Sequence, residues 1–199
     1  MITFRHREIA NEQLVLDSRT ELYYLGPALT LRNCTLFVKV PAKALVMTKT
    51  RLIDCTIEVQ RLLKNYQWDS VHLKGCRFKG RFIGNDFGGW PTGPAEGSIE
   101  GCDFTSAHLD QTRFLNCDAQ ALRFPAWPYF TLFDPVRRLG ELRTLPWPTN
   151  VRRLELESLA ESPPETVAVT YSAVDLAKRR GTTPEAIKTV LEKLDGVYY

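Results

Sequence analysis

Between Gly97 and Phe124, apolar side chains recur at every fifth residue, and a mostly small residue lies two positions before each of them. The recurring apolar residues are Ile99, Phe104, Leu109, Phe114, Ala119 and Phe124, and the preceding residues are Gly97, Cys102, Ala107, Thr112, Cys117 and Leu122. An amphipathic helix repeats every 3.6 residues and a half-buried strand every 2, so neither accounts for a period of five. The period indicates a wound coil with four short faces, each pointing one larger and one small residue into a narrow interior.

All five cysteines lie in one sequence frame, which runs apolar residue, variable residue, Asn, Asp or Gly, then Cys. They are Cys34, Cys55, Cys76, Cys102 and Cys117, separated by steps of 21, 21, 26 and 15 residues. A period near twenty with a sub-period of five is typical of a solenoid. The 21-residue step also links two sets of apolar residues, which we expect to stack in columns. These sets are Leu36, Ile57, Phe78 and Ile99, and Leu31, Leu52 and Leu73.

The 26-residue step leaves two registers open. Either Gly97 is the equivalent of Cys76, or the segment Gly88–Ser98 is an inserted loop and Cys102 is the equivalent. The surrounding run GNDFGGWPTGPAEG has the glycines of a phosphate-binding loop, but no helical pattern follows to supply an N-terminal dipole. We therefore expect a surface loop with Trp90 at its tip.

The five-residue frame resembles that of the pentapeptide-repeat family over roughly Leu29 to Phe124, about half of the chain. The resemblance implies a right-handed parallel β-helix. Pro41 and Gln67 fall on positions that the family fills with apolar residues, so a looser parallel β-helix stays open as an alternative. The expected fold is mainly β, with residues 1–124 forming a β-solenoid with an N-terminal cap. Residues 125–199 are expected to form an aromatic cap and a small α/β appendage ending in a helical hairpin.

The segment after Phe124 is rich in aromatic residues and prolines. Phe124, Trp127, Tyr129, Phe130 and Phe133 belong to it, and we expect them to plug the open last coil, with an aromatic docking surface as the alternative. Two strand-like runs follow, Val151–Leu156 and Thr166–Tyr171. The turn-forming sequence ESPPE separates them.

The end of the chain has the signals of two short helices. Ser172 is expected to cap the first, Gly181 to end it, and Pro184 to lie in the first turn of the second. The spacing of Ala177, Gly181, Ile187 and Val190 resembles a helix-turn-helix. However, Arg180 and Thr182 beside the glycine are polar, and the second helix balances acidic with basic residues. A structural or partner-binding hairpin is favoured over a DNA-binding one.

No chemical motif stands out. Zinc sites bring cysteines into close pairs such as C-x2-C, which this chain lacks, so the thiols are expected to pack as small apolar groups. The three histidines are scattered, and His72 and His108 flank inward residues, so both should point outward. We expect no catalytic residue, no metal and no cofactor.

Charge suggests a protein-binding surface. The chain has 26 Lys and Arg against 23 Asp and Glu, a net charge of +3, which argues against a DNA mimic. Arg77, Lys79 and Arg81 form an outward basic group. Asp103, Asp110 and Asp118 form an acidic one, for which acid–base catalysis is the less favoured alternative. The candidate partner-binding residues are Arg77, Lys79, Arg81, Trp90, Asp103, His108 and Asp110.

We therefore expect a non-enzymatic, protein-binding module. The family resemblance implies one role, that of an immunity-type protein of bacterial appearance that neutralises a toxin. The alternative is a DNA-associated regulator that uses the C-terminal hairpin, although nucleic acid is the less favoured partner. A homodimer is compatible with the sequence. Neither a secretory signal nor a membrane-spanning run is visible, so a cytoplasmic location is expected.

Overall fold

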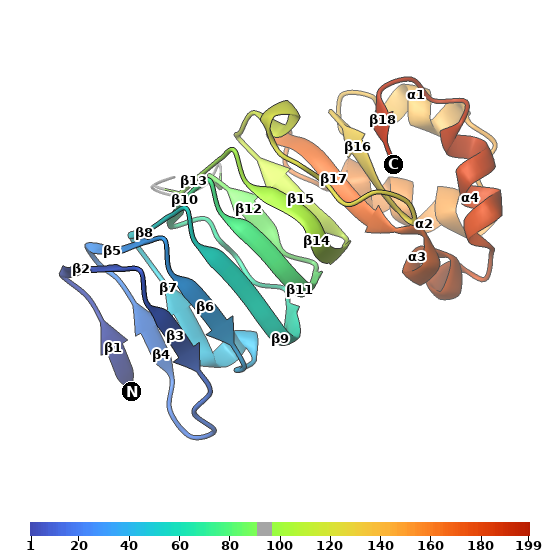
Figure 1. Ribbon diagram of the computed structural model, residues 1–199. Coiled ribbons are helices and arrows are strands. Elements are labelled where there is room, and N and C mark those ends of the chain that lie inside the picture. Colours follow the sequence, from blue (N-terminus) through green and yellow to red (C-terminus); the bar gives the residue numbers. More distant parts are fainter. Residues whose placement is uncertain (91–96) are drawn as a thin grey trace.

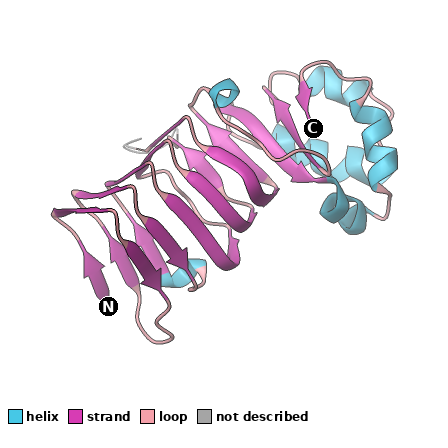
Figure 2. Ribbon diagram, viewed as in Figure 1, coloured by secondary structure: helices cyan, strands magenta, loops and turns pink. Residues whose placement is uncertain are grey.

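A computed structural model describes residues 1–90 and 97–199 of the chain. Figure 1 shows an elongated stack of strands that leads into a smaller unit with helices, and Figure 2 shows that strands dominate the whole. The chain makes about four turns of a β-solenoid. The expected mainly β solenoid with a small C-terminal helical part is confirmed.

Three parallel sheets form the sides of the solenoid. The first contains β1 (Ile2–Phe4), β4 (Tyr23–Leu25) and β7 (Leu45–Met47). The second contains β2 (Arg7–Ala10), β5 (Leu29–Arg32), β8 (Thr50–Ile53), β10 (Val71–Lys74) and β13 (Ser98–Glu100). The third contains β3 (Gln13–Leu16), β6 (Thr35–Val38), β9 (Thr56–Lys64), β11 (Arg77–Ile83) and β14 (Asp103–Asp110). Segments between the third and first sheets, such as the 3-10 helix η1 (Ala42–Ala44), complete each turn.

The sequence frame around the cysteines marks one corner of the coil in four of its five occurrences. The residue before Cys has a positive φ, as in Asn33 (φ 50°), Asp54 (φ 53°) and Gly75 (φ 62°). Asn, Asp and Gly tolerate this left-handed conformation better than other residues, which explains why the frame requires them. The following thiol then points inward and donates to a carbonyl of the turn below, as Cys76 Sγ does to Leu52 O at 3.2 Å.

The strand register decides between the two alignments. Leu73 pairs with Ile99 and Lys74 with Glu100, so Cys102 is the equivalent of Cys76 and the longer connection lies between β12 (Asp86–Gly88) and β13. Residues 91–96 of that connection lie outside the described part. The column Leu31, Leu52 and Leu73 is confirmed and continues into Ile99. In the other column, Leu36, Ile57 and Phe78 pair in register as expected. Only Ile99 is misplaced in it, because the insertion shifts the register by one five-residue unit.

Aromatic rings fill the later turns of the solenoid. Phe78 stacks on Phe104 with ring centroids 4.5 Å apart, and Phe87 stacks on Phe114 at 5.5 Å. Each buried side chain of this size contributes roughly 1.5–3 kcal/mol before conformational entropy is counted. Gly80 lies beside a register shift in β11, and a Cβ there would be 2.0 Å from the Val59 carbonyl oxygen. No other residue fits that position without moving the neighbouring strand.

A mixed sheet joins the solenoid to the C-terminal unit. Its strands, in spatial order, are β12, β15 (Thr112–Leu115), β17 (Thr166–Ser172), β16 (Tyr129–Phe133) and β18 (Val197–Tyr198). The strand β17 runs antiparallel to β15, the last strand of the coil on this side. The helices are α1 (Leu139–Thr144), α2 (Thr149–Ala160), α3 (Ala173–Arg180) and α4 (Pro184–Leu191). The short 3-10 helix η2 (Ala119–Ala121) follows the final solenoid strand.

Two of the secondary-structure predictions for this unit are confirmed and one is wrong. The strand β17 and the hairpin α3–α4 form as expected: Ser172 accepts a hydrogen bond from Asp175 N, and Gly181 ends α3 with a φ of 67°. The run Val151–Leu156, however, is part of helix α2, not a strand. The buried residues of α2 are Val151, Glu155, Leu156 and Leu159, a helical spacing that appears only when the whole segment is considered.

The aromatic segment after the solenoid faces two different cores. Phe124 is buried against the rings of Phe114 and Phe133, so these residues close the coil as expected. Phe130 instead stacks on Tyr171, at 5.5 Å, in the separate core of the helical unit. The segment is therefore a plug on one side and part of a second core on the other.

Among the described helices, none combines the length and apolarity that a membrane span requires.

Candidate partner-binding surface

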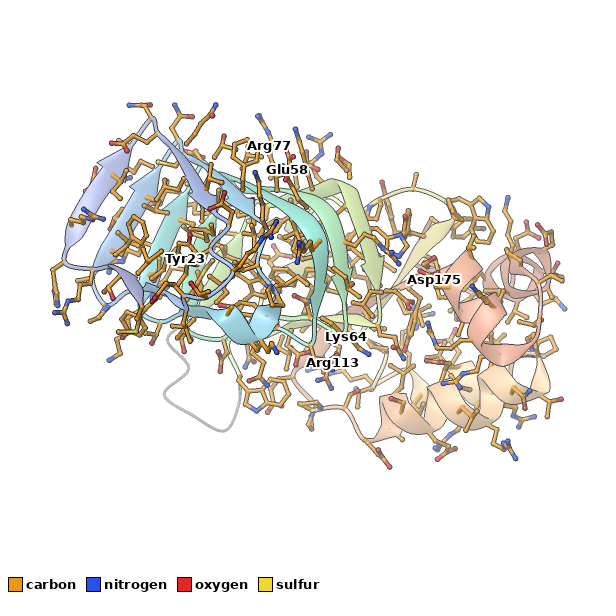
Figure 3. The ribbon with its side chains drawn as sticks, turned by 90° about the horizontal axis from the view of Figure 1, so that it is seen from below. Tyr23, Glu58, Lys64, Arg77, Arg113 and Asp175 are labelled. Atoms are coloured by element: carbon orange, nitrogen blue, oxygen red, sulfur yellow. The ribbon has the colours of Figure 1, made fainter. Side chains whose placement is uncertain are left out.

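A row of basic side chains follows two neighbouring strands of the third sheet. Because strand residues alternate between two faces, Phe78 and Phe82 point into the core while Arg77, Lys79 and Arg81 are exposed, as the sequence predicts. Arg61 and Lys64 are exposed on the adjacent strand β9. We call Arg61, Lys64, Arg77, Lys79 and Arg81 the basic strip. Figure 3 shows Arg77 near one end of these strands and Lys64 near the other.

The cations of the basic strip form no close ion pair with the described residues, although the charge of Arg77 acts on the neighbouring Asp103. Over residues 1–90 and 97–199, no carboxylate lies within 4.0 Å of any of the five. Glu58, opposite Lys79 in the register, is half-buried, and its carboxylate accepts a hydrogen bond from Gln60. The whole net charge of the chain comes from the solenoid, since residues 1–124 have 16 basic and 13 acidic residues. The strip is therefore a positive surface on a rigid sheet.

Asp103 lies at the edge of the strip, opposite Arg77, and is held in place. Its carboxylate accepts hydrogen bonds from the Thr105 N–H at 2.9 Å and the Thr105 hydroxyl at 2.7 Å, and Arg123 lies 3.2 Å away. Partial burial raises the pKa of Asp103, but the hydrogen bonds from Thr105 and the charge of Arg123 outweigh it, so the net shift is downward. Asp103 thus anchors the last turn and leaves the strip predominantly basic.

His108 does not lie on an open surface, which corrects the expectation from the sequence. Its Nε2 lies 2.6 Å from Asp175 Oδ2 on α3, and its Nδ1 lies 3.0 Å from the Tyr129 hydroxyl on β16. A carboxylate only accepts, so Nε2 carries the proton and, in the neutral ring, Nδ1 accepts from Tyr129. Burial and the Asp175 carboxylate raise the pKa of Tyr129. Figure 3 shows Asp175 where the helical unit meets the solenoid.

The prediction that Asp110 lies on the exposed surface is also wrong. Its side chain is 1% exposed and lies beneath α3. Its carboxylate contacts Arg179 Nη1 at 2.5 Å and accepts a hydrogen bond from Ser172 N–H at 3.2 Å. Burial raises the pKa of Asp110, although the hydrogen bond and charge of Arg179 act in the opposite direction. Asp118 caps η2 instead. The predicted acidic surface group of Asp103, Asp110 and Asp118 therefore does not form.

A second buried carboxylate extends this network into the helical unit. Glu155 Oε1 lies 2.8 Å from Arg180 and 3.7 Å from Arg179, so two arginines of α3 hold two carboxylates from β14 and α2. Sequence reasoning missed Tyr129, Asp175, Arg179 and Glu155 as a group. They lie far from His108 and Asp110 along the chain, and no spacing rule connects them.

Trp90 lies at the base of the long connection rather than at its tip. It is half-buried, and the guanidinium of Arg113 lies 5.4 Å from its ring centroid. Arg113 in turn binds Asp86 with two hydrogen bonds, at 2.7 and 2.9 Å. Residues 91–96, which follow Trp90, lie outside the described residues. Trp90 is therefore a packing residue in this part of the structure.

The thiols have the environment of packing residues. Cys34, Cys55, Cys76 and Cys102 form one buried column. The hydrogen bond with Cys102 is the largest cause that raises the pKa of Cys76, to about 12, and burial raises that of Cys117 to about 12. The interaction with the Cys76 thiol lowers the pKa of Cys102. The Cys102 thiol is fully buried, so solvent does not reach it. Within the described ranges, no three His, Cys, Asp or Glu side chains are placed to hold a metal ion.

Three cations of the C-terminal hairpin contact other parts of the chain. Arg179 and Arg180 pair with the buried carboxylates, and the Lys188 ammonium lies 5.3 Å from the Trp127 ring centroid. The hairpin thus offers fewer free cations for phosphates than the sequence alone suggests.

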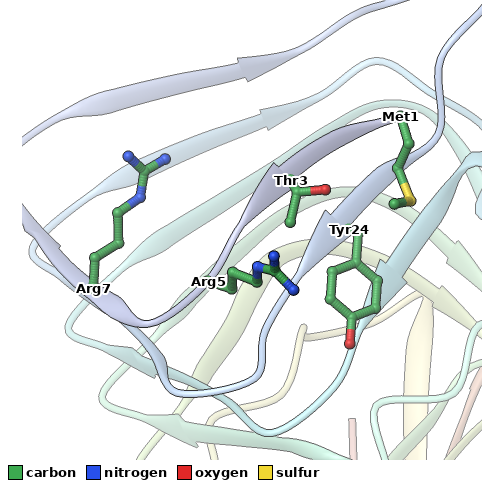
Figure 4. Close-up of a pocket in the computed structure, with 5 residues that line it drawn as sticks. All are labelled: Met1, Thr3, Arg5, Arg7 and Tyr24. Carbon is green, nitrogen blue, oxygen red and sulfur yellow. The ribbon is translucent and has the colours of Figure 1, made fainter.

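Several hollows lie on the described surface. One has a volume of ≈ 510 Å³ and lies at the first sheet. Figure 4 shows the residues that line it, Met1, Thr3, Arg5, Arg7 and Tyr24. His72 borders another, and its Nδ1 lies 3.1 Å from the Ser98 hydroxyl.

Comparisons with known proteins identify no relative: no family model matches the chain, and neither a curated protein nor a solved structure matches it.

Proposed function

We propose that the chain is a non-enzymatic, protein-binding module that docks the acidic surface of a partner protein on the basic strip. The observation that carries this proposal is the set of five cations, exposed on β9 and β11, without a carboxylate of the described chain within 4.0 Å. A charged surface that is not neutralised internally attracts a surface of opposite sign and speeds the encounter with it.

The scaffold supports this use. The residues that hold the coil together point inward, so the outward positions of the sheet can specify a partner without disturbing the stack. Because β9 and β11 are interior strands of a five-stranded sheet, their backbone is already hydrogen-bonded on both sides. A partner would therefore meet a preformed surface, and little ordering would be needed on binding.

A neutralising role is the form of binding that we propose for this module. A cytoplasmic immunity-type protein needs a broad, rigid face that covers the functional surface of a toxin, and the sheet provides such a face. The pentapeptide-like five-residue frame supports the same role by resemblance. The toxin surface would be acidic where it meets Lys79 and Arg81.

A photo-crosslinking residue placed at position 79 tests the proposal, with position 51 as the matched control. Arg51 is also an exposed, outward strand residue, but it belongs to the second sheet. We expect one partner protein to be crosslinked from position 79 and not from position 51. The Lys79→Glu variant should weaken binding of that purified partner by at least tenfold at low salt, while Arg51→Glu should change it less than twofold. Equal crosslinking from both positions, or equal affinities of the two variants, would refute the proposal.

Binding to a duplex DNA of about 30 base pairs tests the alternative, that the basic strip binds nucleic acid. We expect no retention of the chain on this DNA at physiological salt, because at most five phosphate contacts give weak binding that salt screens. Salt-dependent DNA binding that Lys79→Glu abolishes would assign the strip to nucleic acid instead.

A further inference from the structure

The two ends of the solenoid are finished differently. At one end, β1, β2 and β3 are each the last strand of their sheet, and each pairs on one side only, with β4, β5 and β6. Within residues 1–90 and 97–199, no segment covers their outer edges. We call this the open end; Figure 1 shows it at the opposite pole from the helical unit.

The other end is closed by the chain itself. β17 pairs with β15, and Arg123 bridges to Asp103 on β14. Ala168 is fully buried in the solenoid core, and Phe133 and Val167 pack against that core. The apolar side chains at this end are thus covered, although β13 keeps an unpaired edge there, since among the described strands it pairs with β10 alone. A second solenoid would find no open core to stack on.

The apolar core reaches the surface at the open end. A hollow of ≈ 440 Å³ is lined there by Phe4, Ile9 and Leu14. Ile9 and Leu14 are 9% and 7% exposed, whereas Leu31 and Leu36, their partners in the next turn, are fully buried. Phe4 is half-buried, and Val15, on the edge strand β3, is 44% exposed. Exposed apolar groups beside unpaired strand edges favour association.

The rim of this hollow has both signs of charge. Arg7, Glu8 and Glu12 line it, together with Gln13. Glu8 already pairs with Arg32 of the next turn, at 3.1 Å. The two-fold arrangement that we infer sets Arg7 of one copy against Glu12 of the other. The rim is therefore complementary to itself, while a uniformly acidic or basic partner would meet repulsion somewhere on it.

We propose that the open end is a homodimer interface at which two copies of this chain meet end to end about a two-fold axis. This symmetry makes the facing edge strands antiparallel, which is the more stable form of strand pairing. A second solenoid of the same cross-section matches the apolar hollow and its rim. Because the opposite end is closed, the association stops at two copies rather than growing into a fibre.

The test is the mass of the full chain in solution, measured by sedimentation equilibrium from low to high micromolar concentration. We expect a concentration-dependent dimer. Arg7→Glu makes the rim entirely acidic and Glu12→Arg makes it predominantly basic, so each variant alone should dissociate at least tenfold more readily. Mixed in equal amounts, the two variants should restore the dimer.

Arg51→Glu is the control, since it makes the same change on a side of the coil, and it should leave the dimer intact. Circular dichroism of each variant checks that the fold is retained. A chain that stays monomeric throughout the concentration range overturns the proposal. So does a dimer that Arg7→Glu leaves unchanged, or a mixture of the two variants that fails to associate.

Discussion

The solenoid and the helical unit are held together by different interactions. In the solenoid, like residues stack on like, and the inward polar groups are neutral thiols, hydroxyls and amides bonded to the backbone, as Thr50 is to Leu25 O at 2.7 Å. Where the helical unit meets the solenoid, charged groups are buried instead, with Asp110 and Glu155 held by Arg179 and Arg180. Stacking of equivalent side chains stabilises the solenoid, whereas individual buried ion pairs orient the helical unit. Substitutions should therefore affect the two regions in different ways.

The largest effect is expected from Phe104→Asp. The ring of Phe104 is buried between Phe78 and Phe114, at 4.5 and 5.3 Å, so the variant places a charge in an apolar stack. We expect a loss of at least about 4 kcal/mol in the free energy of unfolding, or failure to fold. Denaturant unfolding followed by circular dichroism measures it. Ser106→Asp, which is exposed on the same strand, should cost less than about 0.5 kcal/mol; similar losses in both variants would contradict the register.

Asp110→Ala should have the next largest effect. It leaves Arg179 of α3 without its closest carboxylate. Breaking a fully buried pair costs about 3–5 kcal/mol, and we expect the lower end of that range because Arg179 is 29% exposed and keeps Glu155 at 3.7 Å. We expect hydrogen exchange to accelerate in β17 and α3 more than in β8 and β10. Glu157→Ala, at an exposed ion pair with Arg143, is the control. Uniform acceleration over the whole chain would show that the two regions form one cooperative unit.

His108→Ala tests the contacts that the structure gives to a side chain expected from the sequence to point outward. An exposed histidine without partners would make the substitution nearly neutral. The variant removes the contacts to Asp175 and Tyr129, so we expect a loss of about 1–2 kcal/mol in thermal unfolding. His72→Ala, which loses only the contact to Ser98, should cost less. Equal effects would mean that the contacts of His108 add nothing to the junction.

Asp103→Asn should have the smallest effect, and its size depends on pH. The pKa of Asp103 is lowered in the folded chain, so its charge stabilises the fold above the unfolded pKa of about 4. That contribution disappears as the pH falls through the lower, folded-state value. We expect a difference below about 1 kcal/mol from the unmodified chain at pH 7 and none near pH 2. A difference that grows toward acid would contradict this assignment.

Sequence reasoning succeeded wherever a local repeat determined the structure. The frame of Asn, Asp or Gly before each cysteine, the column Leu31, Leu52 and Leu73, and the caps at Ser172 and Gly181 all follow from short-range sequence patterns. It failed at Val151–Leu156, where six residues were too short a window to separate a strand from a helix. It also left the 26-residue step unresolved, because an insertion of one repeat unit preserves the five-residue pattern on both sides.

The amino-acid sequence alone determined which side chains point into the coil, since the alternation of inward and outward residues is a property of the backbone. Only the tertiary structure decided which outward residues stay in contact with solvent. Arg77 and Lys79 stay exposed, whereas His108 and Asp110 are covered by a helix more than sixty residues later in the chain. Burial of an outward residue depends on which distant segment packs over it. A pattern of neighbouring residues does not predict that contact.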